Sequence, residues 1–458
     1  MGDTHVPMLG NGQIEEKIPP VVKAVKKRWL ILIMYIVYAT ISTFQWVEYS
    51  IITNIVMRYY DVSASAVEWT AVIFMVMWPI LVFPASFIID RMGLRTAALI
   101  GCLATAIGAA IKVFSIGQNL FFVVMIGQTI VAVSQIFILS LPPKIAVTWF
   151  KANEVSTVCS LGIFGMQLGS ALGFLVPPML VRNHENLDDI GTDLYKMCWG
   201  LTAVITPVSF LVFFYFQERP KYSPSQAQID ERDNKEEVTL SVFLSSLKSL
   251  LKNKPFLIHT TSYGFCYGIF SAIGTLMNPY ILNYFEGAEE DAGRMGLVMI
   301  LIGIAGSILT GFILDKTHKF KESAFVIFLL CSISSAALLF TLELRSKWLV
   351  YVAISVFGFF LNAYMPAGIE FATELTFPSA ESTVTGILLA TSQILAVIFT
   401  LSLSAINKKF GTFWALSIQS LILLVGTILT GLTPNVLKRQ EAFGRDVQFE
   451  KVPLNEKA

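Results

Sequence analysis

Long apolar segments dominate the pattern of this chain, and short polar segments separate them. A helix needs roughly 20 apolar residues to cross a bilayer, and twelve segments reach or approach that length. Because lipid offers the backbone no hydrogen-bond partners, we predict that each segment is an α-helix. Some exceed the length that the bilayer requires, which predicts tilted or kinked helices. They cover 29–59, 67–87, 97–115, 119–141, 154–181, 195–216, 256–284, 294–314, 324–342, 347–372, 382–405 and 412–434.

A long polar segment, 217–255, separates six apolar segments from the other six. This arrangement resembles the major facilitator superfamily, in which two six-helix halves rock around a central site. We therefore predict an all-α membrane protein with that fold, with twelve transmembrane helices in two six-helix bundles related by pseudo-two-fold symmetry. The predicted parts are an N-terminal tail (1–28), an N-terminal bundle (29–216), a linker (217–255), a C-terminal bundle (256–434) and a C-terminal tail (435–458).

Composition and charge agree with a membrane protein. Hydrophobic residues make up 55% of the chain and charged residues 14%, against roughly 25% charged residues in soluble proteins. The net charge of +1 gives no indication of a nucleic-acid partner. Most of the 33 Lys and Arg residues fall on one side if both termini are cytoplasmic, as the positive-inside rule requires. We predict a multi-pass protein of the lipid bilayer with both termini cytoplasmic, in the plasma membrane by default, with internal membranes as the alternative.

Two short polar loops carry the same charge motif. "IIDRMGLR" (88–95) follows the second apolar segment, and "ILDKTHKFK" (313–321) follows the eighth. Both place an acid before a base at the cytoplasmic end of the second helix of a half, which resembles the signature loop of the superfamily. We predict a charge-paired latch between the halves; the alternative is a positive-inside loop with an incidental acid. The latch residues would be Asp90, Arg91, Gly93, Arg95, Asp315 and Lys316.

Polar and aromatic residues interrupt several apolar segments at membrane depth. On the first predicted helix they form one stripe, because a helix turns about 100° per residue. Lipid-facing surfaces do not need such residues, whereas a water-filled cavity does. An intramembrane Gln can also bond only to a neighbouring helix, so this alternative stays open for each one. The predicted cavity residues include Trp46, Tyr49, Gln135, Gln167, Tyr267, Ser271, Asn278 and Gln393.

A lining of aromatic rings and amides suits a small organic cation. A quaternary ammonium has no N–H group, and aromatic faces attract it by roughly 0.5–2 kcal/mol per ring. Glu48 lies off the stripe, so it either pairs with a neighbouring helix or acts as a charge-sensing group beside the cavity. Lys112, near the end of its segment, is expected to extend to the lipid headgroups.

Several motifs resemble the feline leukaemia virus subgroup C receptor-related (FLVCR) family, over essentially all twelve segments. They include "FQWVEYSII", "SQIFILSLPPKIAVTWF" and "YMPAGIEFATELTFP". The resemblance implies facilitated transport of choline and ethanolamine, and it implies that Trp46, Gln135 and Gln393 surround the bound cation. It also places Ser271 where the family has a Tyr, and Glu48 where it has a Gln. We hypothesise that Tyr267, one turn earlier on the same face, supplies the missing ring.

Two other functions remain as alternatives. The resemblance also implies haem transport, but the four His residues lie in tails, loops or helix ends, away from the predicted cavity. A non-transporting nutrient receptor or sensor would not need the duplicated latch. We predict no enzyme, because no phosphate loop, metal-ligand cluster or nucleophile motif occurs, and correspondingly no cofactor and no metal. The chain is expected to act as a monomer.

Overall fold

The computed structural model describes residues 26–151, 154–220, 248–379, 381–436 and 440. Within these residues, twelve helices are long and apolar enough to cross a membrane, which confirms the twelve predicted segments. Most of the predicted tails and linker (1–25, 221–247, 437–439 and 441–458) lies outside the described residues. The boundaries of the five predicted parts therefore stay a prediction.

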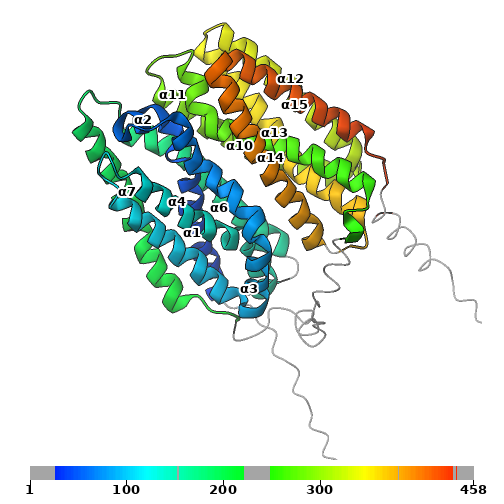
Figure 1. The fold of residues 1–458 in the computed structure, drawn as a ribbon. Helices are drawn as coiled ribbons and strands as arrows, with labels where there is room; N and C mark the ends of the chain where they lie inside the picture. The colour runs from blue at the N-terminus through cyan, green and yellow to red at the C-terminus, as the bar shows by residue number, and fades with distance from the viewer. Residues whose placement is uncertain (1–25, 152–153, 221–247, 380, 437–439, 441–458) are drawn as a thin grey trace, which may run out of the picture.

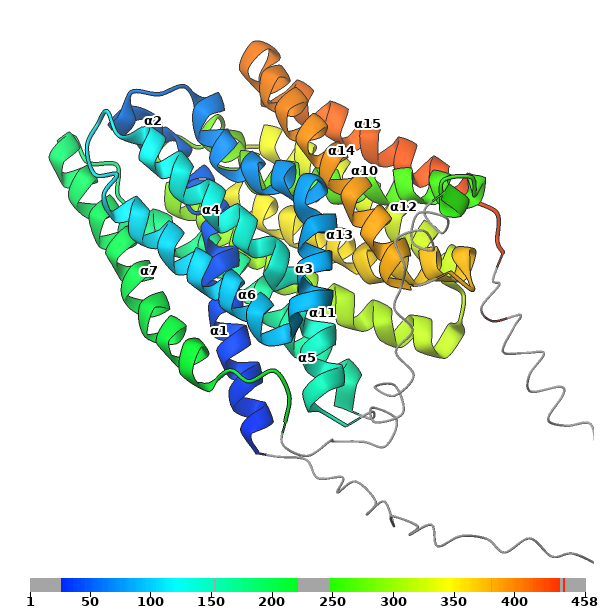
Figure 2. The same ribbon diagram turned by 60° about the horizontal axis from the view of Figure 1, so that its bottom comes forward.

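The helices form two groups that lie side by side (Figure 1). In both views α7 and α15 lie on opposite flanks of the molecule (Figure 2). The N-terminal half consists of α1 (Lys27–Val47), η1 (Ser50–Ile52), α2 (Thr53–Tyr60), α3 (Ala64–Val113), α4 (Phe121–Leu139), α5 (Leu141–Trp149), α6 (Val155–Leu180) and α7 (Leu187–Tyr215). The C-terminal half consists of α10 (Lys254–Leu282), α11 (Glu289–Thr317), α12 (Phe320–Glu343), α13 (Lys347–Thr376), α14 (Glu381–Phe410) and α15 (Thr412–Leu432).

The first membrane span is broken in its middle. The regular helix α1 ends at Val47, and Ile52 leaves the helical region with φ −119° and ψ 33° before α2 begins. Side chains bond to two carbonyls beside the break. Gln128 donates its Nε2 to the carbonyl of Gln45 (2.9 Å), and Asn278 donates its Nδ2 to that of Ile51 (2.8 Å). The expected kink is thus present in this long segment, at Ile52, between Trp46 and the start of α2.

Close contact between α1 and α6 depends on glycine. A Cβ atom on Gly169 would lie 2.0 Å from Thr43 Oγ1 and 2.2 Å from the carbonyl oxygen of Thr40. The Thr43 hydroxyl uses this proximity to donate a hydrogen bond to the carbonyl of Met166 (2.8 Å). Small residues at such spacing let two membrane helices approach closely, so this face of α6 fixes the position of α1 and of Trp46 near its end.

Contacts between the halves gather at one end of the molecule, which we call the closed side. Here α2 and the end of α6 meet the start of α11, and the start of α3 meets the end of α14. Asn54 donates to Glu289 (2.7 Å) across the halves. Glu68, only 2% exposed, accepts hydrogen bonds from Ser404 (2.5 Å) and from Lys408, whose Nζ lies 3.0 Å from Glu68 Oε1. The chain begins its first helix at the opposite end.

Candidate functional site

Trp46 lies between the two halves near the middle of the membrane span. Its ring is partly exposed and stacks on Phe270 of α10, with 6.0 Å between ring centroids and 28° between planes. A Cβ on Gly274 would lie 3.1 Å from the indole Cη2, so glycine gives the ring room beside α10. The indole also packs against a cluster of α3 and α4 residues, namely Phe74, Val131 and Ala132.

A phenol and an amide lie next to this aromatic stack. Tyr267, one turn before Phe270 on α10, has its ring centroid 6.2 Å from that of Phe270. Gln393 on α14 donates its Nε2 to the Tyr267 hydroxyl (3.0 Å). The carbonyl oxygen of Gln393 is buried and has no hydrogen-bond partner among the described residues. This oxygen is therefore a free acceptor, and the Tyr267 hydroxyl still has its own proton to donate.

The structure brings together three of the predicted cavity residues, Trp46, Tyr267 and Gln393, through one residue that we did not predict. That residue is Phe270, which contacts both Trp46 and Tyr267. It lies three residues after Tyr267 and four before Gly274, which places all three on one helix face. This periodicity was the available signal, but a Phe among apolar residues does not stand out as a site residue.

Gln135 lies close to this group by its position on α4. It is partly exposed and lies one helical turn after Val131 and Ala132. These two residues pack against Trp46. Ser271 is buried beside Phe270 on α10. Both stay candidates for the site.

Three other predicted cavity residues have partners away from the Trp46 ring. Asn278 bonds to the carbonyl of Ile51 and to the Asn54 side chain (3.1 Å), where it joins the halves on the closed side. Gln167 donates to Asn362 (3.3 Å), also across the halves. Tyr49 is buried within the N-terminal half, with its hydroxyl 3.6 Å from the Cys198 sulfur.

The expectation that Lys112 extends to the lipid headgroups is wrong. Its side chain is 1% exposed, and its Nζ forms an ion pair with Glu48, which is fully buried. Of the two interpretations of Glu48, the structure therefore places it in a pair with a neighbouring helix. Local periodicity carries no direct signal for this pair, because 64 residues separate the two side chains along the chain.

The first predicted latch loop is held within its own half. Gly93 adopts φ +86°, a left-handed conformation that glycine tolerates, and the turn separates the second span from the third. The backbone N–H groups of Leu94 and Arg95 donate to the Glu218 carboxylate (2.8 and 2.7 Å), and the Arg95 guanidinium donates to the carbonyl of Phe213 (3.1 Å). Glu218, just after α7, was missed from sequence.

The described contacts do not test the predicted pairing of the other latch residues. In the second half, Asp315 and Lys316 are exposed at the end of α11. The side chain of Asp90 lies outside the described residues, and Arg91 has an interaction within the structure. The latch between the halves stays a prediction.

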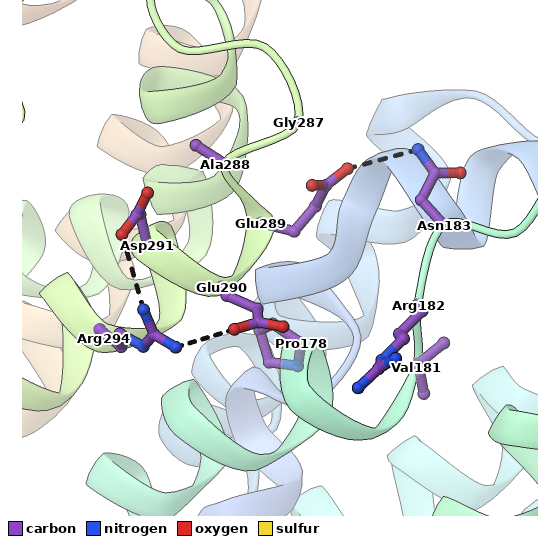
Figure 3. Close-up of a pocket in the computed structure, with 10 residues that line it drawn as sticks. All are labelled: Pro178, Val181, Arg182, Asn183, Gly287, Ala288, Glu289, Glu290, Asp291 and Arg294. Carbon is purple, nitrogen blue, oxygen red and sulfur yellow. Dashed lines mark hydrogen bonds and ion pairs between the residues drawn. The ribbon is translucent and has the colours of Figure 1, made fainter.

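A cavity of about 340 Å³ opens at the rim of the closed side, away from Trp46 (Figure 3). It lies between the end of α6 and the start of α11, and charged side chains surround it. Arg294 pairs with Glu290 (2.8 Å), while Glu289 accepts from Asn183 (3.3 Å). Because its own acids and bases largely pair with one another, we assign the central group around Trp46, and not this rim, as the candidate site.

Comparisons with known proteins agree with the architecture. Residues 31–400 match the family model of the Major Facilitator Superfamily. The choline/ethanolamine transporter flvcr2a of Danio rerio is 38% identical over 96% of this chain and 93% of its own length. The Homo sapiens choline/ethanolamine transporter FLVCR2 is 37% identical over 92% of this chain and 80% of its own length. A solved bacterial homologue of the human lysosomal transporter Spinster shares the fold, with a TM-score of 0.70 at 15% identity, over 91% of this chain and 99% of that one.

Proposed function

Because this chain belongs to the major facilitator superfamily and, within it, to the family of the FLVCR choline/ethanolamine transporters, we propose that it carries choline and ethanolamine across a membrane. Its twelve spans make it an integral multi-pass membrane protein, and its family is one of transporters, not of enzymes. Transport is facilitative and proceeds by alternating access, in which the halves rock about a site between them.

The observation that carries this proposal is the group formed by Trp46, Phe270, Tyr267 and Gln393. The stacked rings of Trp46 and Phe270 come from different halves, so a cation held over them contacts both bodies that must move. Such rings attract an onium group without requiring an N–H donor. The Tyr267 hydroxyl and the free carbonyl oxygen of Gln393 then offer a donor and an acceptor to the alcohol group of the substrate.

We further propose that the closed side faces outward, so that the site is reached from the cytoplasm in this conformation. Contacts such as Glu68 with Lys408 and Asn54 with Glu289 would then form the outer closure. This orientation agrees with cytoplasmic termini, because α1 begins at the opposite end. We propose as well that the protein lies in the plasma membrane and acts as a monomer, and that the charge-paired latch connects its halves.

Haem is less well supported as a substrate. His259 bonds through Nε2 to the carbonyl of Gly368 (2.7 Å), and His184 bonds to Asp193 (2.9 Å). Among the described residues, neither these His side chains nor His318 join the group around Trp46. Competition of labelled choline uptake by haem tests this alternative. Choline binding without flux in proteoliposomes would instead indicate a receptor.

The experiment that tests the proposed function is parallel uptake of choline, ethanolamine and haem by the wild type and by Trp46→Ala. Loss of one aromatic face should cost about 1–2 kcal/mol, or roughly 5- to 30-fold in apparent choline affinity. Trp199→Ala is a matched control, because Trp199 is 47% exposed on the flanking helix α7. Equal choline uptake by Trp46→Ala and the wild type would contradict the proposal, as would haem uptake without choline uptake.

A further inference from the structure

The N-terminal half encloses an ion pair that the proposed transport does not use directly. Lys112, near the end of α3, donates from Nζ to Glu48 Oε1 and to Gln128 Oε1 (3.3 Å). Its ammonium also lies 5.5 Å from the ring centroid of Tyr49. All four side chains are at most 1% exposed, so the charges are isolated from solvent and from the substrate site.

These contacts hold the chain on both sides of Trp46. Glu48, two residues after Trp46, is tied to Lys112 on α3. Gln45, one residue before it, has its carbonyl bonded by the Nε2 of Gln128 on α4 (2.9 Å). Gln128 in turn accepts from Lys112, so one connected group holds Gln45 before the indole and Glu48 after it. The regular helix α1 ends at Val47, between these two contacts, and within this group the Gln128 amide bonds directly to the backbone.

Stability alone does not explain why two charges are buried at this point. The free energy lost by removing two charges from water offsets much of the attraction between them. Apolar side chains of similar volume therefore often stabilise a protein at least as well. What the pair adds is a directional contact at a defined place on an interrupted helix. We propose that Glu48, Lys112 and Gln128 are positioning residues that fix the Trp46 ring against Phe270 and Gly274 of the opposite half. The inference rests on the proposed function for the role of Trp46 in binding.

The decisive variant is the double substitution Glu48→Leu with Lys112→Met, which removes both charges and leaves neither one unpaired. We expect it to reach the membrane and to unfold within about 4 °C of the wild type. Its KM for choline should nevertheless rise about fivefold or more, because small displacements of a binding group are costly, while its maximal rate per molecule at the cell surface changes less. Glu48→Gln alone should unfold at a lower temperature, since it leaves the Lys112 ammonium unpaired.

The matched control neutralises an ion pair at the start of the same membrane span. Arg28, at the start of α1, pairs with Glu154 at 2.6 Å, far from Trp46. The double substitution Arg28→Met with Glu154→Leu should leave the KM for choline unchanged. If the Glu48 and Lys112 double variant also keeps the wild-type KM, the pair has a structural role only and the inference is overturned.

A second measurement separates this inference from the proposed function. Acrylamide quenching of Trp46, taken as the difference between each protein and its Trp46→Phe counterpart, reports the position of the indole without any substrate. We expect the quenching constant to change in the double variant and not in the control. Unchanged quenching overturns the inference even if choline is transported. Changed quenching with no choline uptake by the wild type overturns the proposed function and leaves the positioning role intact.

Discussion

The phenol of Tyr267 accepts one hydrogen bond and still has one to give. Its oxygen accepts from the Gln393 amide (3.0 Å), so the proton of the hydroxyl stays available for a third group. The free carbonyl oxygen of Gln393 lies on the same amide and is buried, so leaving it unpaired costs free energy until a donor arrives. An alcohol can satisfy both groups at once, because its oxygen accepts and its proton donates.

Tyr267→Phe tests this assignment because it keeps the ring and removes only the hydroxyl. Loss of one hydrogen bond of about 0.5–1.5 kcal/mol should weaken apparent choline affinity roughly 2- to 12-fold. Inhibition of choline uptake by tetramethylammonium, which has no alcohol group, should not change. Tyr280→Phe is the control, since the buried Tyr280 hydroxyl has no partner among the described residues. Equal losses for choline and tetramethylammonium would show that the hydroxyl does not select the alcohol.

Residue by residue, the site could be predicted only where polarity or size stands out. Trp46 and Gln393 are conspicuous within apolar segments, so pattern and resemblance were enough to select them. Phe270 is not, because a ring between two halves and a ring facing lipid look alike in sequence. The pairing of Lys112 with Glu48 is a long-range contact, and local periodicity carries no information about such contacts.

At the scale of elements, the first span shows that residues on one helix face can have different neighbours. Helical periodicity assigned Tyr49 to the same stripe as Trp46. The backbone stays helical in its dihedral angles through Glu48 and Tyr49, yet the buried Tyr49 hydroxyl lies 3.6 Å from the Cys198 sulfur of α7, within the N-terminal half. The twelve spans themselves could be predicted, because hydropathy over about 20 residues is a local property of the chain. Where one span is interrupted depends instead on partners from α4 and α10.

Glycine packing offers a test at this scale. Gly169→Ala would place a Cβ 2.0 Å from Thr43 Oγ1 and 2.2 Å from the Thr40 carbonyl oxygen, which forces α1 away from α6. Overpacking of this kind typically costs about 1–3 kcal/mol, so the purified variant should unfold at a clearly lower temperature. Gly200→Ala on α7 serves as its counterpart, because no atom lies within 4 Å of its new Cβ. That variant should be as stable as the wild type or slightly more stable. Equal melting of both variants would argue against the close α1–α6 contact.

For the whole molecule, polar contacts between the halves on the closed side set the conformation. Glu68 is nearly inaccessible to solvent. Among the described contacts, its carboxylate accepts hydrogen bonds from Ser404 and Lys408, both in the C-terminal half. A buried carboxylate that loses its cation is strongly destabilised. Opening the closed side should therefore become easier when Lys408 is removed.

Lys408→Met should shift the population toward a state that is open on this side. Thr400, fully buried on α14 beside Met75 of the other half, can report the shift as Thr400→Cys. A membrane-impermeant maleimide added from outside should label this cysteine at least about threefold faster in the Lys408→Met background. In the Lys409→Met background, the cysteine of Thr400→Cys should be labelled at the same rate as without a lysine substitution. The Lys409 ammonium lies over the ring of Phe410 and not at Glu68. Identical labelling in all three backgrounds would contradict the assigned closure.

The enclosed Glu48–Lys112 pair also has an electrical consequence. Its carboxylate and ammonium belong to the same half, so they move together and sum to zero when that half tilts. The pair therefore transfers no net charge through the transmembrane field when the empty protein reorients. A bound onium ion adds one positive charge to the same motion, worth about 2.3 kcal/mol per 100 mV if it crosses the full field. For the proposed substrates, voltage would drive the loaded step, and a negative interior would concentrate the cation without a second ion or a nucleotide.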